Sequence, residues 1–151
     1  MDELELRTKV STILGAQLYG VLSTQGEAGA PHASIIAFVT ADALGSLVFV
    51  TPRTTRKFTY LVARPEAAFF IDDRRSDPDE LMQVTGIEVH GAVTELTGDE
   101  RTVYRELYLA RHPAMASFID APGSALMCMT VDRYDVVDHF QHVLVLPGAC
   151  P

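Results

Sequence analysis

Residues 46–71 read SLVFVTPRTTRKFTYLVARPEAAFFI, and the rest of the architecture can be worked out from this stretch. The apolar run Leu47–Thr51 is followed by a basic segment, Arg53–Lys57, and then by a short amphipathic segment. Pro65 ends that segment, because a proline disfavours helical geometry at the residue before it. A second apolar run, Ala67–Ile71, follows at once. The stretch therefore predicts a strand, a short helix that begins among cations, and a buried strand.

The cations at the start of this helix are unusual. The N-terminal end of a helix carries partial positive charge, so Asp and Glu are the favoured residues there. Free backbone N–H groups at the same end bind anions. In a chain with a formal net charge of −8, this local reversal indicates a phosphate site. The alternative is a solvated basic turn that forms surface ion pairs with Asp72 or Asp73.

The segments on either side of this stretch predict hairpins. Short turns separate apolar runs at 18–23, 31–40 and 46–51, and residues 84–96 alternate between apolar and polar side chains. Residues 124–140 form a long β-like segment. Short connections between successive strands imply antiparallel pairing. We therefore expect one domain over residues 1–151 of the mainly β (α+β) class, a six-stranded antiparallel barrel with peripheral helices.

Three or four helices should cover this barrel. Residues 2–17 form an amphipathic helix with Asp2 and Glu5 as a capping box, and Thr97 with Glu100 predicts a second capping box for a helix ending near Arg111. A shorter helix should follow His112–Pro113. The residues expected on the inner helix faces are Leu6, Val10, Ile13, Leu14 and Leu18 in the first helix, Phe58, Leu61 and Val62 in the basic one, and Val103, Leu107 and Ala110 in the third.

Composition narrows the function classes. The 151 residues are 48% hydrophobic and 21% charged, which is ordinary for a globular domain. No apolar run is long enough to span a membrane, and the acidic N-terminus does not resemble a secretory signal, so we expect a cytoplasmic protein. The negative charge argues against nucleic acid as a partner. Cys128 should be a small core residue, and a disulfide with Cys150 is not expected in a reducing compartment.

Histidines and acidic residues offer weaker signals. His139-x-x-His142 suggests metal or haem ligation, although on a continuous strand the two rings would face opposite ways, and an exposed strand end is the simpler interpretation. His90 is expected to be a surface or interface residue. The loop at 72–80 carries five carboxylates but no glycine, so we expect a solvated or interface loop rather than a calcium site. No Cys/His spacing predicts a zinc site.

The order of these segments resembles one known family. The hairpin PHASIIAF…SLVFVT, the segment TPRTTRKFTYLVARPEAAFFI, the strand VHGAVTEL and the segment YLARHPAMASFI are together similar to the pyridoxamine 5′-phosphate oxidase-like, FMN-binding split-barrel family. The resemblance extends from about Leu18 to Tyr134. It implies a homodimeric split barrel with FMN at the subunit interface.

The resemblance also implies a set of cofactor contacts and a function. The phosphate of FMN would be held by the basic segment and the ring by neighbouring strands; the implied residues are Ser34, Ile35, Ile36, Val50, Thr51, Arg53, Thr54, Thr55, Arg56 and Lys57. It implies an FMN-dependent oxidoreductase acting on a small molecule, with no catalytic side chain named. The alternatives are a non-catalytic flavin- or haem-binding or redox-sensing module, and a deazaflavin or haem in the same place.

Two features depart from the family pattern. True pyridoxamine phosphate oxidases carry a C-terminal segment with Trp, Arg and His, whereas this chain has no Trp and ends in HFQHVLVLPGACP. Vitamin B6 oxidation is therefore not expected. Gly86–Ile87 also stands where a polar contact from the partner subunit to the flavin is expected.

Overall fold

A computed structural model describes residues 1–139 and 142–148. Its helices and first six strands follow the expected order, with three short 3-10 turns in the loops between strands. The elements are α1 (Glu3–Ala16), β1 (Tyr19–Gln25), β2 (Pro31–Ala41), β3 (Ser46–Pro52), α2 (Arg56–Ala63), β4 (Glu66–Asp72), β5 (Gly86–Glu95), α3 (Gly98–Arg111), α4 (Ala116–Asp120), β6 (Ser124–Asp138) and β7 (His142–Pro147).

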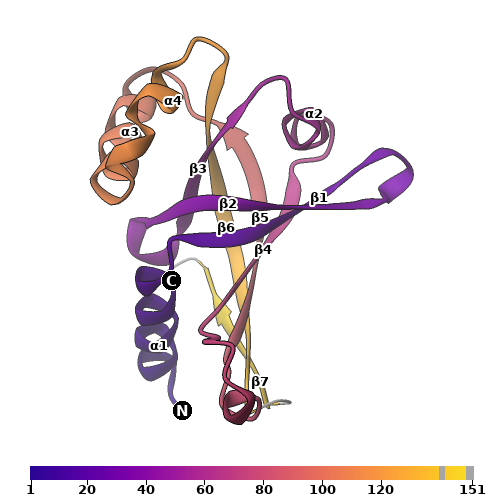
Figure 1. The fold of residues 1–151 in the computed structure, drawn as a ribbon, viewed down its shortest axis with the longest axis vertical. Helices are drawn as coiled ribbons and strands as arrows, with labels where there is room; N and C mark the ends of the chain where they lie inside the picture. Colours follow the sequence, from indigo (N-terminus) through magenta and orange to yellow (C-terminus); the bar gives the residue numbers. More distant parts are fainter. Residues whose placement is uncertain (140–141, 149–151) are drawn as a thin grey trace.

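Six antiparallel strands close into a barrel in the described part of the chain. The order is β3-β2-β1-β4-β5-β6, and β6 pairs again with β3 to complete the ring. The seventh strand, β7, pairs with the outer half of β6 and lies outside the barrel. In Figure 1 the β1–β2 hairpin runs across the long strands β5 and β6, with α2 beside one end of the barrel. The expected six-stranded barrel is confirmed.

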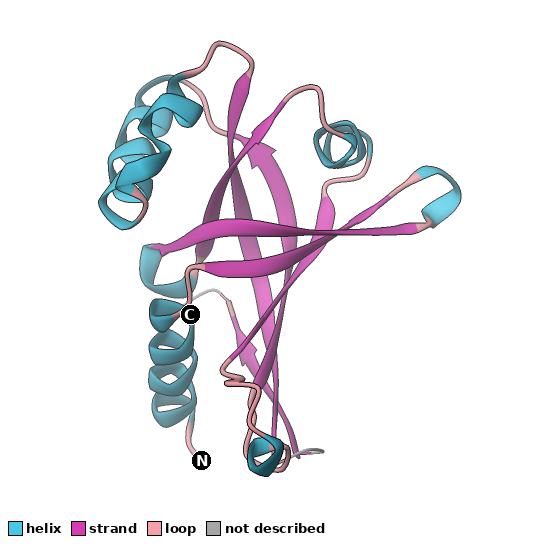
Figure 2. Ribbon diagram, in the orientation of Figure 1, coloured by secondary structure: helices cyan, strands magenta, loops and turns pink. Residues whose placement is uncertain are grey.

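Two apolar clusters hold the fold together. The larger one fills the barrel and includes Phe69, whose ring packs against those of Phe38 and Phe49. The smaller one lies between the outer face of the sheet and the helices α3 and α4, which Figure 2 shows together on one side. Cys128 belongs to this smaller cluster and is buried, as expected.

Helix α1 packs its predicted stripe into the larger cluster. Leu6, Val10, Ile13 and Leu14 are buried, and the Asp2–Glu5 capping box is present. The expectation for Leu18 is wrong, because Leu18 lies beyond the C-terminal end of α1 and is 43% exposed.

Helix α3 packs through a different face from the expected one. Val103 is 66% and Leu107 39% exposed, and Ala110 is exposed as well, whereas Tyr108 is buried against the smaller cluster. The sheet beneath α3 offers a flat apolar surface that accommodates the tyrosine ring, so the helix is rotated toward Tyr108. Thr97 is the N-cap residue, but its side chain makes no capping bond, and Gly98 begins the helix with a φ of 61°.

The C-terminal part of the described chain contains an element that the sequence pattern did not predict. The chain turns at His139, which has a φ of 46°, and returns as β7 along β6. Only Leu146 of β7 is buried, so the alternation that marks a strand is weak there. Cys150 lies outside the described residues. Within residues 1–139 and 142–148, no helix is long and apolar enough to cross a membrane.

Candidate functional site

The barrel opens where β2 and β3 separate. The two strands pair from Ala41↔Ser46 to Phe38↔Phe49 and no further. Beyond that point the first part of β2 pairs only with β1, and the end of β3 pairs only with β6. In the described residues, each strand thus presents an unpaired backbone edge to the same gap. This gap between β2 and β3 is called the split below.

The strand residues expected at a cofactor site lie on both sides of the split. Ser34, Ile35 and Ile36 are on the unpaired part of β2, and Val50 and Thr51 are on the unpaired part of β3. Ile36 belongs to the barrel core, Val50 to the cluster under α3 and α4, and Thr51 is fully buried. These three side chains are therefore occupied by packing, and only their backbone groups can face a ligand.

Ile35 differs from its neighbours because its side chain points outward. It is 72% exposed, which is high for a large apolar residue on a strand. Tyr19 is 59% and Phe70 43% exposed on the same outer face, where Val21 pairs with both Ile35 and Phe70. The outer face of β2, β1 and β4 is therefore an apolar surface, called the outer apolar face below. Such exposed patches mark binding or assembly surfaces.

Thr55 organises the start of α2. It is the N-cap residue, and its hydroxyl accepts a hydrogen bond from the N–H of Phe58 at 3.3 Å. The same hydroxyl lies 2.8 Å from that of Thr51 and 2.9 Å from the Pro52 carbonyl, to which it donates. This network ties the helix start to the end of β3. Leu61 anchors the helix in the barrel core, while Val62 is 70% exposed, against expectation.

Arg56 and Lys57 occupy the first turn of α2 without an acidic neighbour in that turn. Among the described residues neither side chain takes part in a recorded hydrogen bond or ion pair. Lys57 is partly buried, and this burial lowers the pKa of its ammonium group. The first N–H groups of a helix also lack partners within the helix. The start of α2 therefore combines two cations and free N–H donors, an arrangement that suits a phosphate group.

Arg53 is held differently from these two cations. Its guanidinium contacts the Glu95 carboxylate at 2.5 Å and the Pro122 carbonyl at 3.2 Å. Arg53 thus forms the ion pair that the alternative interpretation expected, although its partner is Glu95 rather than Asp72 or Asp73. Thr54 is exposed between Arg53 and the helix. Arg53 therefore stabilises the turn before α2, whereas Arg56 and Lys57 have no such partner among the described residues.

One buried polar atom indicates that the split suits a polar ligand. The Ser34 hydroxyl is buried and has no hydrogen-bond partner among the described residues. Burying an unsatisfied hydroxyl costs free energy, and such atoms in a folded protein call for an explanation. The hydroxyl belongs to the strand that borders the split. Together with the unpaired strand edges and the cations of α2, it fits a cofactor that carries both a phosphate and polar groups.

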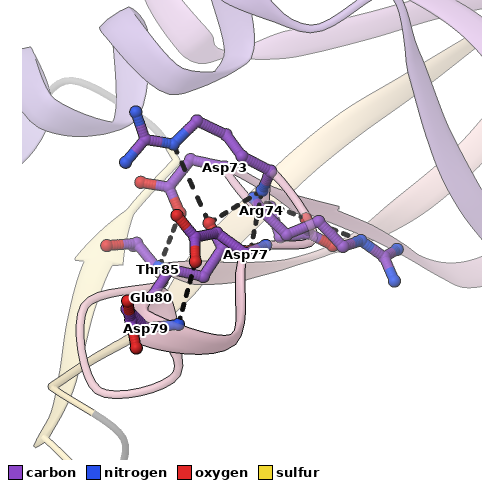
Figure 3. A network of polar contacts seen from close by, with 8 residues as sticks. Asp73, Arg74, Asp77, Asp79, Glu80 and Thr85 are labelled. Atoms are coloured by element: carbon purple, nitrogen blue, oxygen red, sulfur yellow. Dashed lines mark hydrogen bonds and ion pairs between the residues drawn. The ribbon is translucent and has the colours of Figure 1, made fainter.

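The acidic loop between β4 and β5 uses its carboxylates to hold its own backbone (Figure 3). Asp73 accepts a hydrogen bond from the Thr85 N–H at 2.7 Å, and Glu80 accepts one from the Arg75 N–H at 2.8 Å. Asp77 caps the short turn that follows it. The loop flanks a hollow of about 460 Å³ that is lined by Phe70, Leu81 and Val84 among others. Its charges thus serve mainly to fix the loop.

The structure separates the histidines into different roles. His112 is buried, and its Nε2 lies 2.7 Å from the Phe38 carbonyl, which joins α3 to β2 at the point where the split begins. His142 pairs with Asp138 at 2.8 Å across the β6–β7 turn. His90 contacts both Glu88 and Asp135. Sequence spacing did not predict this last grouping, because it depends on the register between β5 and β6.

The six-stranded barrel and the split between β2 and β3 define a split-barrel protein. A scan of protein families agrees, since the model described as pyridoxamine 5′-phosphate oxidase matches residues 6–138. The chain belongs to this family. A search of curated proteins found no significant sequence match.

Solved structures share the fold at low sequence identity. A heme binding protein from Mycobacterium smegmatis superposes with a TM-score of 0.84 at 21% identity, over 94% of this chain and 57% of that one. A Clostridium acetobutylicum protein related to general stress protein 26 of Bacillus subtilis superposes with a TM-score of 0.73 at 16% identity, over 97% of this chain and 96% of that one. A FAD-binding protein from Mesorhizobium loti superposes with a TM-score of 0.70 at 14% identity, over 85% of this chain and 90% of that one. The chain thus spans little more than half of the Mycobacterium protein.

Proposed function

We propose that this protein is an FMN-binding, homodimeric flavoprotein that acts as an oxidoreductase on a small molecule. The observation that carries the proposal is the split itself, which is bordered by unpaired strand edges and leads to the cationic start of α2. A flavin would supply two-electron redox chemistry, while the protein would supply binding, orientation and exclusion of water.

The start of α2 is assigned to the phosphate of FMN. Arg56 and Lys57 would each donate a charge-assisted hydrogen bond, and the free N–H groups of the first helical turn would add further donors. Partial burial disfavours the charged form of Lys57, so a dianion nearby would offset that cost. Thr55 would act indirectly, because its hydroxyl fixes the turn that presents these donors.

The strands beside the split are assigned to the remainder of the cofactor. Ser34, Ile35 and Ile36 pair with β1 on one edge of β2, and their other edge faces the gap without a strand partner among the described residues. Backbone groups on that free edge can bond the polar edge of the ring or the ribityl hydroxyls. The Ser34 hydroxyl would gain the partner that it lacks. Because one side of the split is bordered by the outer apolar face, a second copy of the chain would cover the bound ring.

The outer apolar face is accordingly assigned to the homodimer. Tyr19, Ile35 and Phe70 expose large apolar side chains on neighbouring strands. Burial of such surface contributes roughly 25 cal/mol per Å². Ile35→Asp should therefore shift the protein from dimer to monomer in sedimentation or light-scattering measurements and weaken FMN binding. Val103→Asp on the exposed face of α3 is the matched control and should change neither property.

The test of the cofactor assignment is a visible spectrum of the purified protein, with mass spectrometry of what it releases on denaturation. The phosphate assignment is tested by titrating flavin-free protein with FMN and with riboflavin. Arg56→Ala combined with Lys57→Ala should weaken the affinity for FMN by about 100-fold or more, because two hydrogen bonds to a charged group are lost. Riboflavin binding should change little, and Arg75→Ala serves as an exposed control.

Two results would overturn these assignments. If the protein is colourless and takes up no FMN when it is offered, the proposal of a flavoprotein fails. If the double variant loses FMN and riboflavin affinity equally, the flavin is bound but its phosphate does not lie at α2.

A haem- or flavin-binding module without turnover is the second candidate. It is favoured by the structural similarity to the Mycobacterium smegmatis heme binding protein. A Soret absorbance band with iron in the released material would identify haem, and competitive titration would identify a deazaflavin. Bound FMN that accepts no electrons from a nicotinamide cofactor would favour a redox-sensing or storage role over catalysis.

A further inference from the structure

The geometry points to a binding site for a divalent transition-metal ion on the outer face of β5 and β6, with Glu88, His90 and Asp135 as its protein ligands. One imidazole and two carboxylates each offer a ligand atom here, and these atoms lie within 4.8 Å of one another. The site does not include the residues assigned to the flavin, although Glu88 stands opposite Phe70 of the outer apolar face.

The register of the two strands brings the three side chains together. Glu88 stands opposite Asp135, and His90 lies two residues further along β5 on the same face. The His90 Nε2 is 2.7 Å from a Glu88 carboxylate oxygen and 3.0 Å from an Asp135 carboxylate oxygen. A single nitrogen thus faces two carboxylates from two neighbouring strands.

A β-bulge in β6 produces this arrangement. The pairing shifts between His90↔Arg133 and Gly91↔Val131, which leaves Asp132 without an opposite residue. If the register of Gly91↔Val131 continued through Asp132 without a bulge, Glu88 would stand opposite Tyr134 instead of Asp135. A Cβ at Gly91 would lie only 2.2 Å from the Thr130 carbonyl oxygen, so the close approach of the strands at the bulge requires glycine. Bulges commonly redirect side chains at functional sites.

The donor set selects the kind of ion. Calcium and magnesium prefer all-oxygen sites, whereas an imidazole with carboxylates suits zinc and the other divalent first-row transition metals. Tetrahedral bonds of about 2.0–2.1 Å separate the ligand atoms by about 3.3 Å, so only small rotations are needed around a metal. Glu88 can make them, because its side chain is 47% exposed. Three protein ligands leave a fourth position open for water or a small anion.

Arg133 is the cation that competes for this site. Its Nε lies 3.1 and 3.3 Å from the two oxygens of Asp135. A metal ion must draw Asp135 away from Arg133, and it must bind the imidazole in its unprotonated form. The proposal therefore predicts that removal of Arg133 strengthens binding, which a chance surface histidine would not show.

The chain contains a natural control in His142. Its Nδ1 contacts Asp138 at 2.8 Å, but that carboxylate also accepts a hydrogen bond from Lys9 at 2.7 Å. His142 thus has one carboxylate that is already neutralised by a lysine, whereas His90 has two carboxylates. If metal binding only required an accessible histidine beside an acid, the two positions would behave alike.

The experiment uses the full-length, tag-free protein after treatment with a chelator and removal of any flavin. Zn²⁺ is titrated by calorimetry, and Co²⁺ is titrated by its visible absorbance, which reports nitrogen coordination. We expect one ion per chain with micromolar affinity. His90→Ala should weaken binding by about 100-fold, while Arg133→Gln should tighten it by about 3- to 10-fold through the loss of one nearby positive charge. His142→Ala should leave the affinity unchanged.

The measurements distinguish loss of metal binding from loss of folding. The far-ultraviolet circular dichroism and melting temperature of each variant show whether it is folded, and Glu88→Gln, at a half-exposed position, provides a second ligand variant. Absence of saturable binding by the wild type at millimolar Zn²⁺ would overturn the proposal. So would equal affinity of wild type and His90→Ala, or weaker binding by Arg133→Gln.

Discussion

The helices α1 and α2 begin with opposite arrangements of charge. In α1 the N-cap is Asp2, acidic residues occupy the first turn, and the capping box closes with hydrogen bonds of 2.8 and 3.0 Å. In α2 the N-cap is Thr55, and Arg56 and Lys57 follow it with no acid in the first turn. The helix dipole stabilises the first arrangement and opposes the second.

The two helices also differ in how their cations are partnered. Lys9 of α1 lies 2.7 Å from Asp138, whose side chain is only 4% exposed, so this pair fastens the helix to β6. Arg56 and Lys57 take part in no recorded ion pair among the described residues. The charges in α1 thus serve stability, whereas those in α2 are assigned by the proposed function to a phosphate ligand. Each prediction below tests one side of this difference.

The largest effect on stability is expected from the Lys9–Asp138 pair. Lys9→Met keeps the length of the side chain but leaves the Asp138 carboxylate buried without its main partner. The pair is partly buried, because the Lys9 side chain is 27% exposed, and loss of a hydrogen bond between charged groups costs about 1.5–3 kcal/mol. Urea unfolding at neutral pH should show this loss, while the affinity for FMN should be unchanged. A loss below about 0.5 kcal/mol would mean that the pair behaves as an ordinary surface contact.

The same pair predicts a dependence of stability on pH. The hydrogen bond from Lys9 is the main reason that the pKa of Asp138 lies below its ordinary value of 3.8. A carboxylate with a lowered folded-state pKa stabilises the protein at higher pH and loses this contribution as the pH falls through that pKa. The difference in unfolding free energy between wild type and Lys9→Met should therefore narrow below about pH 4. A difference that widens there would contradict the assignment.

The N-cap residues of the two helices allow a smaller, matched test. Asp2→Ala and Thr55→Ala should each cost about 1 kcal/mol, because each removes a side-chain acceptor from the first turn. Only Thr55→Ala should also weaken FMN binding, since the Thr55 hydroxyl links α2 to Thr51 beside the split. Chemical unfolding and a flavin titration on both variants check this. Loss of FMN affinity in Asp2→Ala would show that the two helix starts are not functionally distinct.

Much of the fold was predictable because its signals are local. The stripe of α1 and the Asp2 capping box depend on residues within a few positions of one another, and both are confirmed except for Leu18 at the end of the stripe. The hairpins likewise followed from alternation and short turns, and they determine the barrel. The basic segment was placed correctly at the start of α2 by Pro65 and the preceding apolar run.

The parts that were missed depend on contacts between distant segments. The inner face of α3 was assigned to Val103 and Leu107, but the sheet beneath it selects Tyr108. The grouping of His90 with Asp135 requires the bulge in β6, which no local pattern marks. Within the candidate site, sequence could not separate Arg53, which is bound to Glu95, from the two cations that follow it.

The smallest expected effect is also the most direct test of the comparison. Arg56→Glu gives the exposed first residue of α2 the charge that α1 already has at its start, so flavin-free protein should gain about 0.5 kcal/mol from the helix dipole. The mirror variant, Glu3→Lys in α1, should lose a similar amount and also its 3.6 Å contact with Arg7. Arg56→Glu should at the same time abolish the preference for FMN over riboflavin. A variant that gains stability while losing this preference would show that the cations at α2 oppose folding and favour phosphate binding. If Arg56→Glu destabilises the flavin-free protein, Arg56 has a structural role, and the contrast with α1 fails.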